Sequence, residues 1–194
     1  MAVGWLNSEL KKTVPQLKIR LTDFYPNISA FTYLSDSCDN ISYEEQPVNA
    51  MHVPDDLKGL RTQFLSLHHF KPNDAIKILQ SAVNSKSGIA VFEAQERSVP
   101  SILAMVFSPL SVLFTTPFIK PFKLGRVLFT YLIPIVPLFV FWDGVVSSLR
   151  TYSVKEMKSL VDGLDNKDTF NWKIDKINTK PGVILYLVGT PKTS

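Results

Sequence analysis

The clearest pattern of hydrophobic and polar positions lies between residues 61 and 97. Residues 62–67 form a short run of apolar and β-tolerant side chains, closed by a polar His-His pair and Lys-Pro, which predicts a strand. Over residues 72–84 apolar side chains recur at steps of three and four, which predicts a helix whose buried face carries Ala75, Ile76, Leu79, Ala82 and Val83. Residues 89–92 are apolar without alternation, as expected for a strand buried on both faces. Strand, helix and strand in this order predict an open α/β sheet with a parallel pair.

Weaker patterns predict further elements on both sides of this unit. Helices are expected at residues 5–13, at 28–34 after the capping residue Asn27, and at 154–161 after a Ser153–Glu156 capping box. Strands are expected at 17–22, in the segment bracketed by 41–43 and 48–51, and in a closing antiparallel hairpin of residues 170–177 and 183–189. Helices and strands therefore alternate along the first half of the chain, which is typical of a parallel sheet.

Two uncharged apolar runs follow, at residues 99–119 and 127–142, and a basic cluster separates them: Lys120, Lys123 and Arg126. As one helix the first run would be about 30 Å long, enough to cross the hydrocarbon core of a bilayer. Prolines interrupt both runs, at positions 109, 117, 134 and 137, and each removes a helix hydrogen bond that lipid cannot replace. The pattern favours an insertion over residues 99–152 that lies at a membrane interface or forms a lid over an apolar pocket. Two true membrane spans and an ordinary buried core are the alternatives.

Composition narrows the class of protein. The chain has 194 residues, enough for one well-buried domain. Its net charge of +4 gives weak support for contact with anionic lipid, and no basic patch interleaved with aromatic residues indicates nucleic-acid binding. Cys38 is the only cysteine, which excludes an internal disulfide and a cysteine-rich metal site, and no cation beside it favours a nucleophilic thiolate. The first residues lack the pattern of a signal peptide, so we expect a cytoplasmic, membrane-associated protein.

Candidate chemistry is expected at the carboxyl ends of the strands, where open α/β sheets bind their ligands. His68 and His69 end one predicted strand and are candidates for a proton acceptor or a substrate contact, with hydrogen bonding to the backbone as the alternative. Glu93 and Arg97 follow the next strand and are candidates for substrate binding or for a structural ion pair. Asp23 follows an earlier strand, where a carboxylate either accepts both hydroxyl protons of a ribose or caps the next turn. No metal site is expected, since the chain has one further histidine only.

Three segments together resemble a known family. They are residues 21–27 (LTDFYPN), residues 49–51 (NAM) before Pro54, and residues 64–70 (FLSLHHF) followed by Pro72 and Ala75. Their order is similar to the second, third and fourth strands of class I S-adenosylmethionine-dependent methyltransferases. The likeness is greatest to the bacterial branch whose fourth strand ends in a Leu-His-His motif. The resemblance covers about residues 5–98 and the last strands.

The resemblance implies a three-layer, Rossmann-like methyltransferase sheet that is mostly parallel, has a C-terminal antiparallel hairpin and is N-terminally incomplete. Residues 1–194 would form one domain, with the apolar insertion after the family's fifth strand. S-adenosylmethionine would be the cofactor, with Asp23 at its ribose and Phe24, Ala50 and Met51 beside its adenine. Leu67 and His68 would line the methionine side near the transferred methyl group.

The chain departs from the family before Asp23. The family has a first strand and a glycine-rich loop there, whereas Gly4 is the only glycine that precedes Asp23. We therefore expect either a fragment or a protein that has lost cofactor binding. Because the segment after the family's fifth strand often covers the substrate, an apolar insertion there implies a lipophilic substrate or a lipid. Two hypotheses follow: a membrane-associated methyltransferase acting on a lipophilic acceptor, or a non-catalytic, membrane-associated binding protein on a truncated version of the fold.

Overall fold

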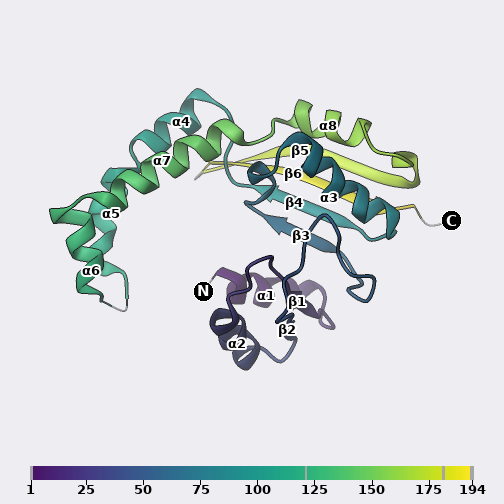
Figure 1. Ribbon diagram of the computed structural model, residues 1–194, viewed down its shortest axis with the longest axis horizontal. Helices are drawn as coiled ribbons and strands as arrows, with labels where there is room; N and C mark the ends of the chain where they lie inside the picture. The colour runs from purple at the N-terminus through teal and green to yellow at the C-terminus, as the bar shows by residue number, and fades with distance from the viewer. Residues whose placement is uncertain (1, 121, 181, 193–194) are drawn as a thin grey trace. The chain divides into compact units, whose positions relative to one another are not determined.

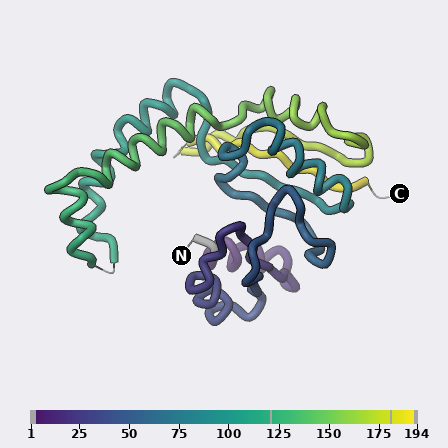
Figure 2. The backbone as a smooth tube through the Cα atoms, in the orientation of Figure 1, coloured from purple at the N-terminus to yellow at the C-terminus, as the bar shows by residue number. Residues whose placement is uncertain are grey.

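A computed structural model describes residues 2–120, 122–180 and 182–192 (Figures 1 and 2). The chain divides into two compact units at the boundary between Leu57 and Lys58. Each unit has its own sheet, and the four-stranded sheet belongs to the second unit. The prediction of one domain over residues 1–194 stays a prediction.

The first unit is built on two short parallel strands, β1 (Ile19–Leu21) and β2 (Ile41–Tyr43), in which Ile19 pairs with Ile41. Helix α1 (Ala2–Thr13) precedes them and α2 (Ile28–Ser37) connects them. As predicted, Asn27 caps α2, because its Oδ1 accepts a hydrogen bond from the backbone N–H of Ala30 at 3.2 Å. The predicted extension of the second strand to residues 48–51 is wrong. That segment turns back on itself through two hydrogen bonds to Asn49.

The second unit contains the larger sheet, in the order β3 (Arg61–Phe64), β4 (Ile89–Glu93), β6 (Gly182–Pro191), β5 (Phe170–Thr179). Strands β3 and β4 are parallel, and β6 is antiparallel to both of its neighbours. Three of the four strands therefore run in one direction, which confirms a mostly parallel α/β sheet with a C-terminal antiparallel hairpin. At one point of the hairpin Trp172 lies opposite Gly189, where an added Cβ would come within 2.4 Å of the indole ring.

Two helices cover this sheet, α3 (Pro72–Asn84) and α8 (Val154–Asp162), and they pack against each other (Figure 1). The buried face of α3 is the predicted one, except that Ile78 rather than Ile76 is fully enclosed. The predicted capping box of α8 is confirmed, since Ser153 and Glu156 exchange hydrogen bonds between side chain and backbone. With Leu187 of β6 and Met157 of α8, this face forms the core of the unit.

Residues 99–150, called here the helical arm, extend from the carboxyl side of β4 (Figure 2). The arm contains α4 (Val99–Val106), α5 (Ser108–Thr115), η2 (Thr116–Phe118), α6 (Leu124–Val127), the π-helical turn η3 (Leu128–Leu132) and α7 (Ile135–Arg150). Pro100, Pro109 and Pro117 lie in the first turns of α4, α5 and η2, and Pro134 is the N-cap of α7, positions at which a missing N–H costs least. α7 returns along α4 and α5.

The stretch Val99–Phe118 is a helix of 20 residues, long and apolar enough to cross a membrane. The pair Leu124–Leu132 and Ile135–Arg150 passes the same test only together and is bent by 76°. Only 6% of the apolar window in Val99–Phe118 is buried, so an ordinary buried core, one of the three alternatives for this segment, is not what the structure shows.

Candidate functional site

The strongest candidate site lies where β3 and β4 end. Because these strands are parallel and Phe64 pairs with Phe92, their carboxyl ends meet at the same edge of the sheet. The chain leaves β3 at Leu65, a non-glycine residue with a left-handed backbone (φ 52°), whose N–H donates to the carbonyl of Phe92 at 2.8 Å. This turn leads directly into η1 (Leu67–His69), and the last residue of β4 is Glu93.

His68 and Glu93 form a buried pair at this edge. Their side chains are 4% and 1% exposed, and Nδ1 of His68 lies 2.8 Å from Oε2 of Glu93. The second carboxylate oxygen, Oε1, accepts the backbone N–H of His68 at 3.2 Å. His68 therefore bonds both carboxylate oxygens of Glu93. Without these bonds the burial of the carboxylate would be costly.

This geometry assigns the two nitrogens of the neutral imidazole. Nδ1 carries the proton, because it faces a carboxylate, and Nε2 is left as the proton acceptor. Among the described residues Nε2 of His68 has no hydrogen-bond partner. Glu93 therefore orients His68 as a base, and Nε2 of His68 is available to another molecule.

The neighbours of His68 in the sequence lie in different surroundings. His69 is exposed, and its ring lies 4.2 Å from that of His68 between centroids. Leu67 is fully buried in the core, so a contact between Leu67 and a cofactor would involve its backbone rather than its side chain.

Tyr152 anchors the end of the loop that carries the two histidines. Its hydroxyl donates to the carbonyl of Phe70 at 2.7 Å, and burial raises the pKa of the phenol above its usual value. Helix α7 also contacts η1, so the helical arm is in contact with this edge of the sheet.

Arg97 is placed away from the buried pair. Its guanidinium bonds Glu156 Oε1 at 3.2 Å and the carbonyl of Thr151 at 3.3 Å, which ties it to the start of α8. Glu96 forms a separate ion pair with Lys176 at 3.1 Å. The ion-pair alternative for these strand-end charges is thus observed, and substrate binding by Arg97 stays a prediction.

In the first unit Asp23 and the segment after Val48 lie side by side. The backbone carbonyl of Asp23 accepts the N–H of Val48 at 2.9 Å, so the turn that contains Ala50 and Met51 follows directly from this contact. The carboxylate of Asp23 is exposed, and its Oδ1 accepts the N–H of Tyr25 at 2.8 Å. One carboxylate oxygen of Asp23 thus caps the next turn, as one alternative predicted. The other oxygen has no partner among the described residues, so ribose binding by Asp23 stays a prediction. Phe24 is 50% exposed beside it.

The link between His68 and Glu93 was not predicted, since the two residues were assigned to different ligands. A signal for it was present: both follow strands expected to be parallel neighbours. Within the described residues no group of three His, Cys, Asp or Glu side chains could hold a metal ion.

Neither a family model nor a curated protein matches the sequence. Solved structures do match the fold. LepI in complex with SAM has a TM-score of 0.54 at 14% identity, and a LepI variant with SAH and a substrate analogue has a TM-score of 0.55 at 16% identity. Both alignments cover 97% of this chain and 40% of that chain, so the chain spans about two fifths of the LepI structures. A putative Zn-dependent alcohol dehydrogenase from Rhodobacter sphaeroides matches with a TM-score of 0.52 at 14% identity, covering 91% of this chain and 76% of its own. The chain therefore has a Rossmann-like α/β fold similar to that of LepI.

Proposed function

We propose that this protein is an S-adenosylmethionine-dependent, methyltransferase-like protein that acts at a membrane on a lipophilic acceptor. The observation that carries the proposal is the buried His68–Glu93 pair, which leaves Nε2 of His68 as an oriented proton acceptor at the carboxyl ends of two parallel strands. The LepI structures that share the fold contain SAM or SAH, which supports the choice of cofactor.

The residues of the first unit fit the cofactor. An exposed carboxylate with one uncommitted oxygen, as in Asp23, suits the two hydroxyl groups of a ribose, and the half-exposed ring of Phe24 suits the face of an adenine. Ala50 and Met51 would complete the apolar surroundings of the base. When bound, S-adenosylmethionine supplies a methyl group on a positively charged sulfur.

His68 would act on the acceptor. A hydroxyl or amine that gains a methyl group must lose a proton, and Nε2 of His68 would take it. Glu93 would stabilise the resulting imidazolium, because its carboxylate already bonds Nδ1 in a site almost free of water. His69, exposed beside His68, would contact the acceptor.

A lipophilic acceptor is favoured by the apolar side chains at the same strand end. Phe64 stacks on Phe92 with ring centroids 5.4 Å apart, and Phe64 and Leu65 remain 52% and 50% exposed. The contact between α7 and η1 joins this surface to the helical arm. Exposed apolar groups beside a buried base are the surroundings in which an apolar substrate would bind.

The proposal is tested by titrating the folded protein with S-adenosylmethionine in a calorimeter. Asp23→Ala should weaken binding by about tenfold or more, the loss expected for hydrogen bonds to a charged group. Asp36→Ala is the matched control, because Asp36 is an exposed acidic residue of α2. Equal affinities for the two variants, or no binding by a folded protein, would exclude this cofactor site.

The second candidate is a non-catalytic, membrane-associated binding protein on the same fold. It is favoured by one observation: the helical arm exposes many large apolar side chains, which can contact lipid without any cofactor. In that case the protein would bind lipophilic molecules, and S-adenosylmethionine would neither bind nor alter that binding.

A further inference from the structure

The helical arm has an inverted distribution of side chains. Large apolar residues are exposed to between 67% and 82%: Phe114, Phe118, Leu124, Leu132, Phe139 and Trp142. Three hydroxyl side chains are enclosed instead, Thr116 at 3%, Thr130 at 0% and Ser148 at 0% exposure, whereas Ser111 and Thr115 are exposed. Proteins surrounded by water normally show the opposite arrangement.

The enclosed hydroxyl groups and the close helix packing favour lipid rather than water as the surroundings of the arm. Thr116 donates to the carbonyl of Val112 at 2.7 Å, whereas the hydroxyls of Thr130 and Ser148 have no partner within the described part of the chain. Small residues between closely packed helices are typical of helices in lipid, where burial of apolar side chains gives no advantage. Gly144 of α7 packs this closely on α4, since an added Cβ would come within 2.8 Å of Sδ of Met105.

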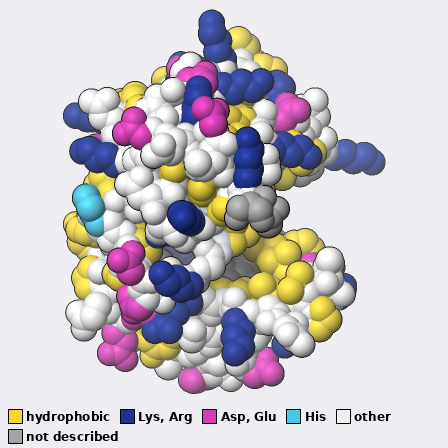
Figure 3. Space-filling view, turned by 90° about the vertical axis from the view of Figure 1, so that its right-hand side faces the viewer, with side chains coloured by type: hydrophobic (Ala, Val, Ile, Leu, Met, Phe, Trp, Pro, Cys, Tyr) yellow, Lys and Arg dark blue, Asp and Glu magenta, His cyan; other side chains and the backbone are white. Residues whose placement is uncertain are grey.

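The charges of the arm match a lipid surface. Residues 98–142 contain no Asp or Glu, and their three cations are close in sequence: Lys120 and Lys123 lie between η2 and α6, and Arg126 lies within α6. By contrast, the face shown in Figure 3 carries acidic and basic side chains interspersed with hydrophobic ones. Anionic headgroups complement such a cluster, whereas a second copy of the arm would bring like charges together.

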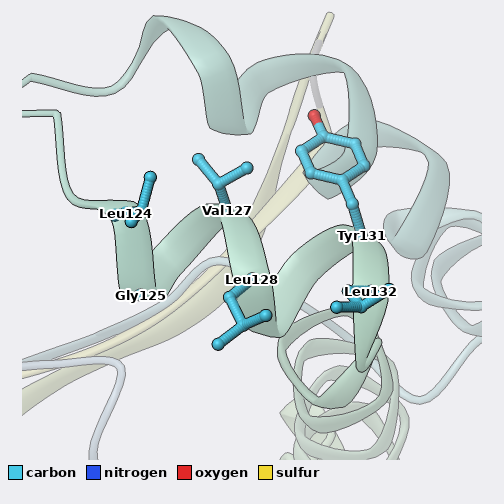
Figure 4. Close-up of a pocket in the computed structure, with 6 residues that line it drawn as sticks. All are labelled: Leu124, Gly125, Val127, Leu128, Tyr131 and Leu132. Atoms are coloured by element: carbon cyan, nitrogen blue, oxygen red, sulfur yellow. The ribbon is translucent and has the colours of Figure 1, made fainter.

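An open groove lies beside these cations. It is lined by Leu124, Gly125, Val127, Leu128, Tyr131 and Leu132, on α6 and η3 (Figure 4). The one polar group of this lining, the hydroxyl of Tyr131, is already hydrogen-bonded to the carbonyl of Leu113. A groove without free polar groups, next to a basic cluster, suits an acyl chain whose phosphate lies on the lysines.

We propose that the helical arm inserts into a lipid bilayer, with its exposed apolar side chains in the hydrocarbon and with Lys120, Lys123 and Arg126 on headgroup phosphates. The 20-residue helix Val99–Phe118 would be about 30 Å long, which matches the thickness of the hydrocarbon core. This inference deepens the membrane association within the proposed function, and it does not depend on methyl transfer.

The first experiment measures co-sedimentation of the full chain with lipid vesicles, without S-adenosylmethionine, so that its result is separate from that of the cofactor titration. Replacing Lys120, Lys123 and Arg126 with Gln should weaken binding to vesicles containing phosphatidylserine by about fivefold per cation, or about a hundredfold together. The same substitutions should change binding to pure phosphatidylcholine little. The control replaces three exposed lysines outside the arm: Lys18, Lys58 and Lys155.

The second experiment tests the apolar contact. Phe139→Asp should reduce binding to both vesicle types by at least about tenfold, because a large apolar side chain leaves the hydrocarbon. Tyr33→Asp, at an exposed aromatic residue of the first unit, should not. In the variant Trp5→Phe, spin-labelled lipid should quench the tryptophan fluorescence. Most of this quenching should be lost when Trp142→Phe is added to that variant.

Three results would overturn the proposal. One is a folded protein that binds neither type of vesicle, and another is vesicle binding that Phe139→Asp leaves unchanged. The third is a stable dimer in which lipid never reaches Trp142, which would assign the arm to a second copy of the chain.

Discussion

Removal of the Glu93 carboxylate tests the central geometry of the candidate site. In Glu93→Ala, the Nδ1–H and the backbone N–H of His68 lose their acceptors inside a nearly dry site, since the two side chains are 4% and 1% exposed. An unsatisfied buried donor costs about 1–3 kcal/mol, and Glu93→Ala leaves two of them. We therefore expect the free energy of unfolding to fall by about 2–6 kcal/mol.

The assay is urea unfolding followed by the fluorescence of Trp172, which lies in β5 of the same sheet. Trp5→Phe and Trp142→Phe, introduced in every variant, leave Trp172 as the only tryptophan. Asp168→Ala is the control for loss of an exposed acidic residue and should change stability by less than about 0.5 kcal/mol.

A double-mutant cycle decides whether the loss comes from the pair itself. His68→Ala combined with Glu93→Ala should cost less than the sum of the two single substitutions, by about 1–3 kcal/mol. Nitrogen NMR should also show one tautomer of His68, protonated at Nδ1, in the unaltered protein and a mixture in Glu93→Ala. A loss below about 1 kcal/mol for Glu93→Ala, or additive single effects, would refute the reasoning.

Three further outcomes can be measured by the same unfolding assay. Gly189→Ala should destabilise the sheet by about 1–3 kcal/mol, since its Cβ would fall 2.4 Å from the ring of Trp172; an unchanged stability would contradict that packing. Lys86→Gly should stabilise by about 1 kcal/mol, because Lys86 directly follows the C-cap residue Ser85 of α3 and has a left-handed backbone (φ 52°); any loss of stability would count against this strain. The backbone N–H of Ser153 lowers the pKa of Glu156, so this carboxylate adds stability above about pH 4.5 that disappears as pH falls through the lowered pKa. Glu156→Gln should remove that pH dependence while costing less than about 1 kcal/mol at neutral pH, as the side chain is 42% exposed; an unchanged acid profile would exclude this contribution.

Local elements could be predicted because neighbouring residues determine them. The apolar face of α3, the capping box of α8 and the closing hairpin all follow from spacing within a few residues. The segment 48–51 could not be predicted in this way. Its apolar residues suit a strand, but the side chain of Asn49 closes a turn there.

Sequence alone determined the α/β class, the parallel pair and the end of β4 at Glu93, whereas the strand predicted to run to residue 67 ends at Phe64 and His68 lies in η1. Only the tertiary structure decided that these two side chains bond each other. They are separated by 25 positions, and the register of β3 against β4 sets their distance. The helical arm shows the same limit. Nearly every residue there is apolar, so periodicity does not indicate a buried face, and helix packing alone placed Thr116 and Thr130 inside with Phe114 and Phe118 outside.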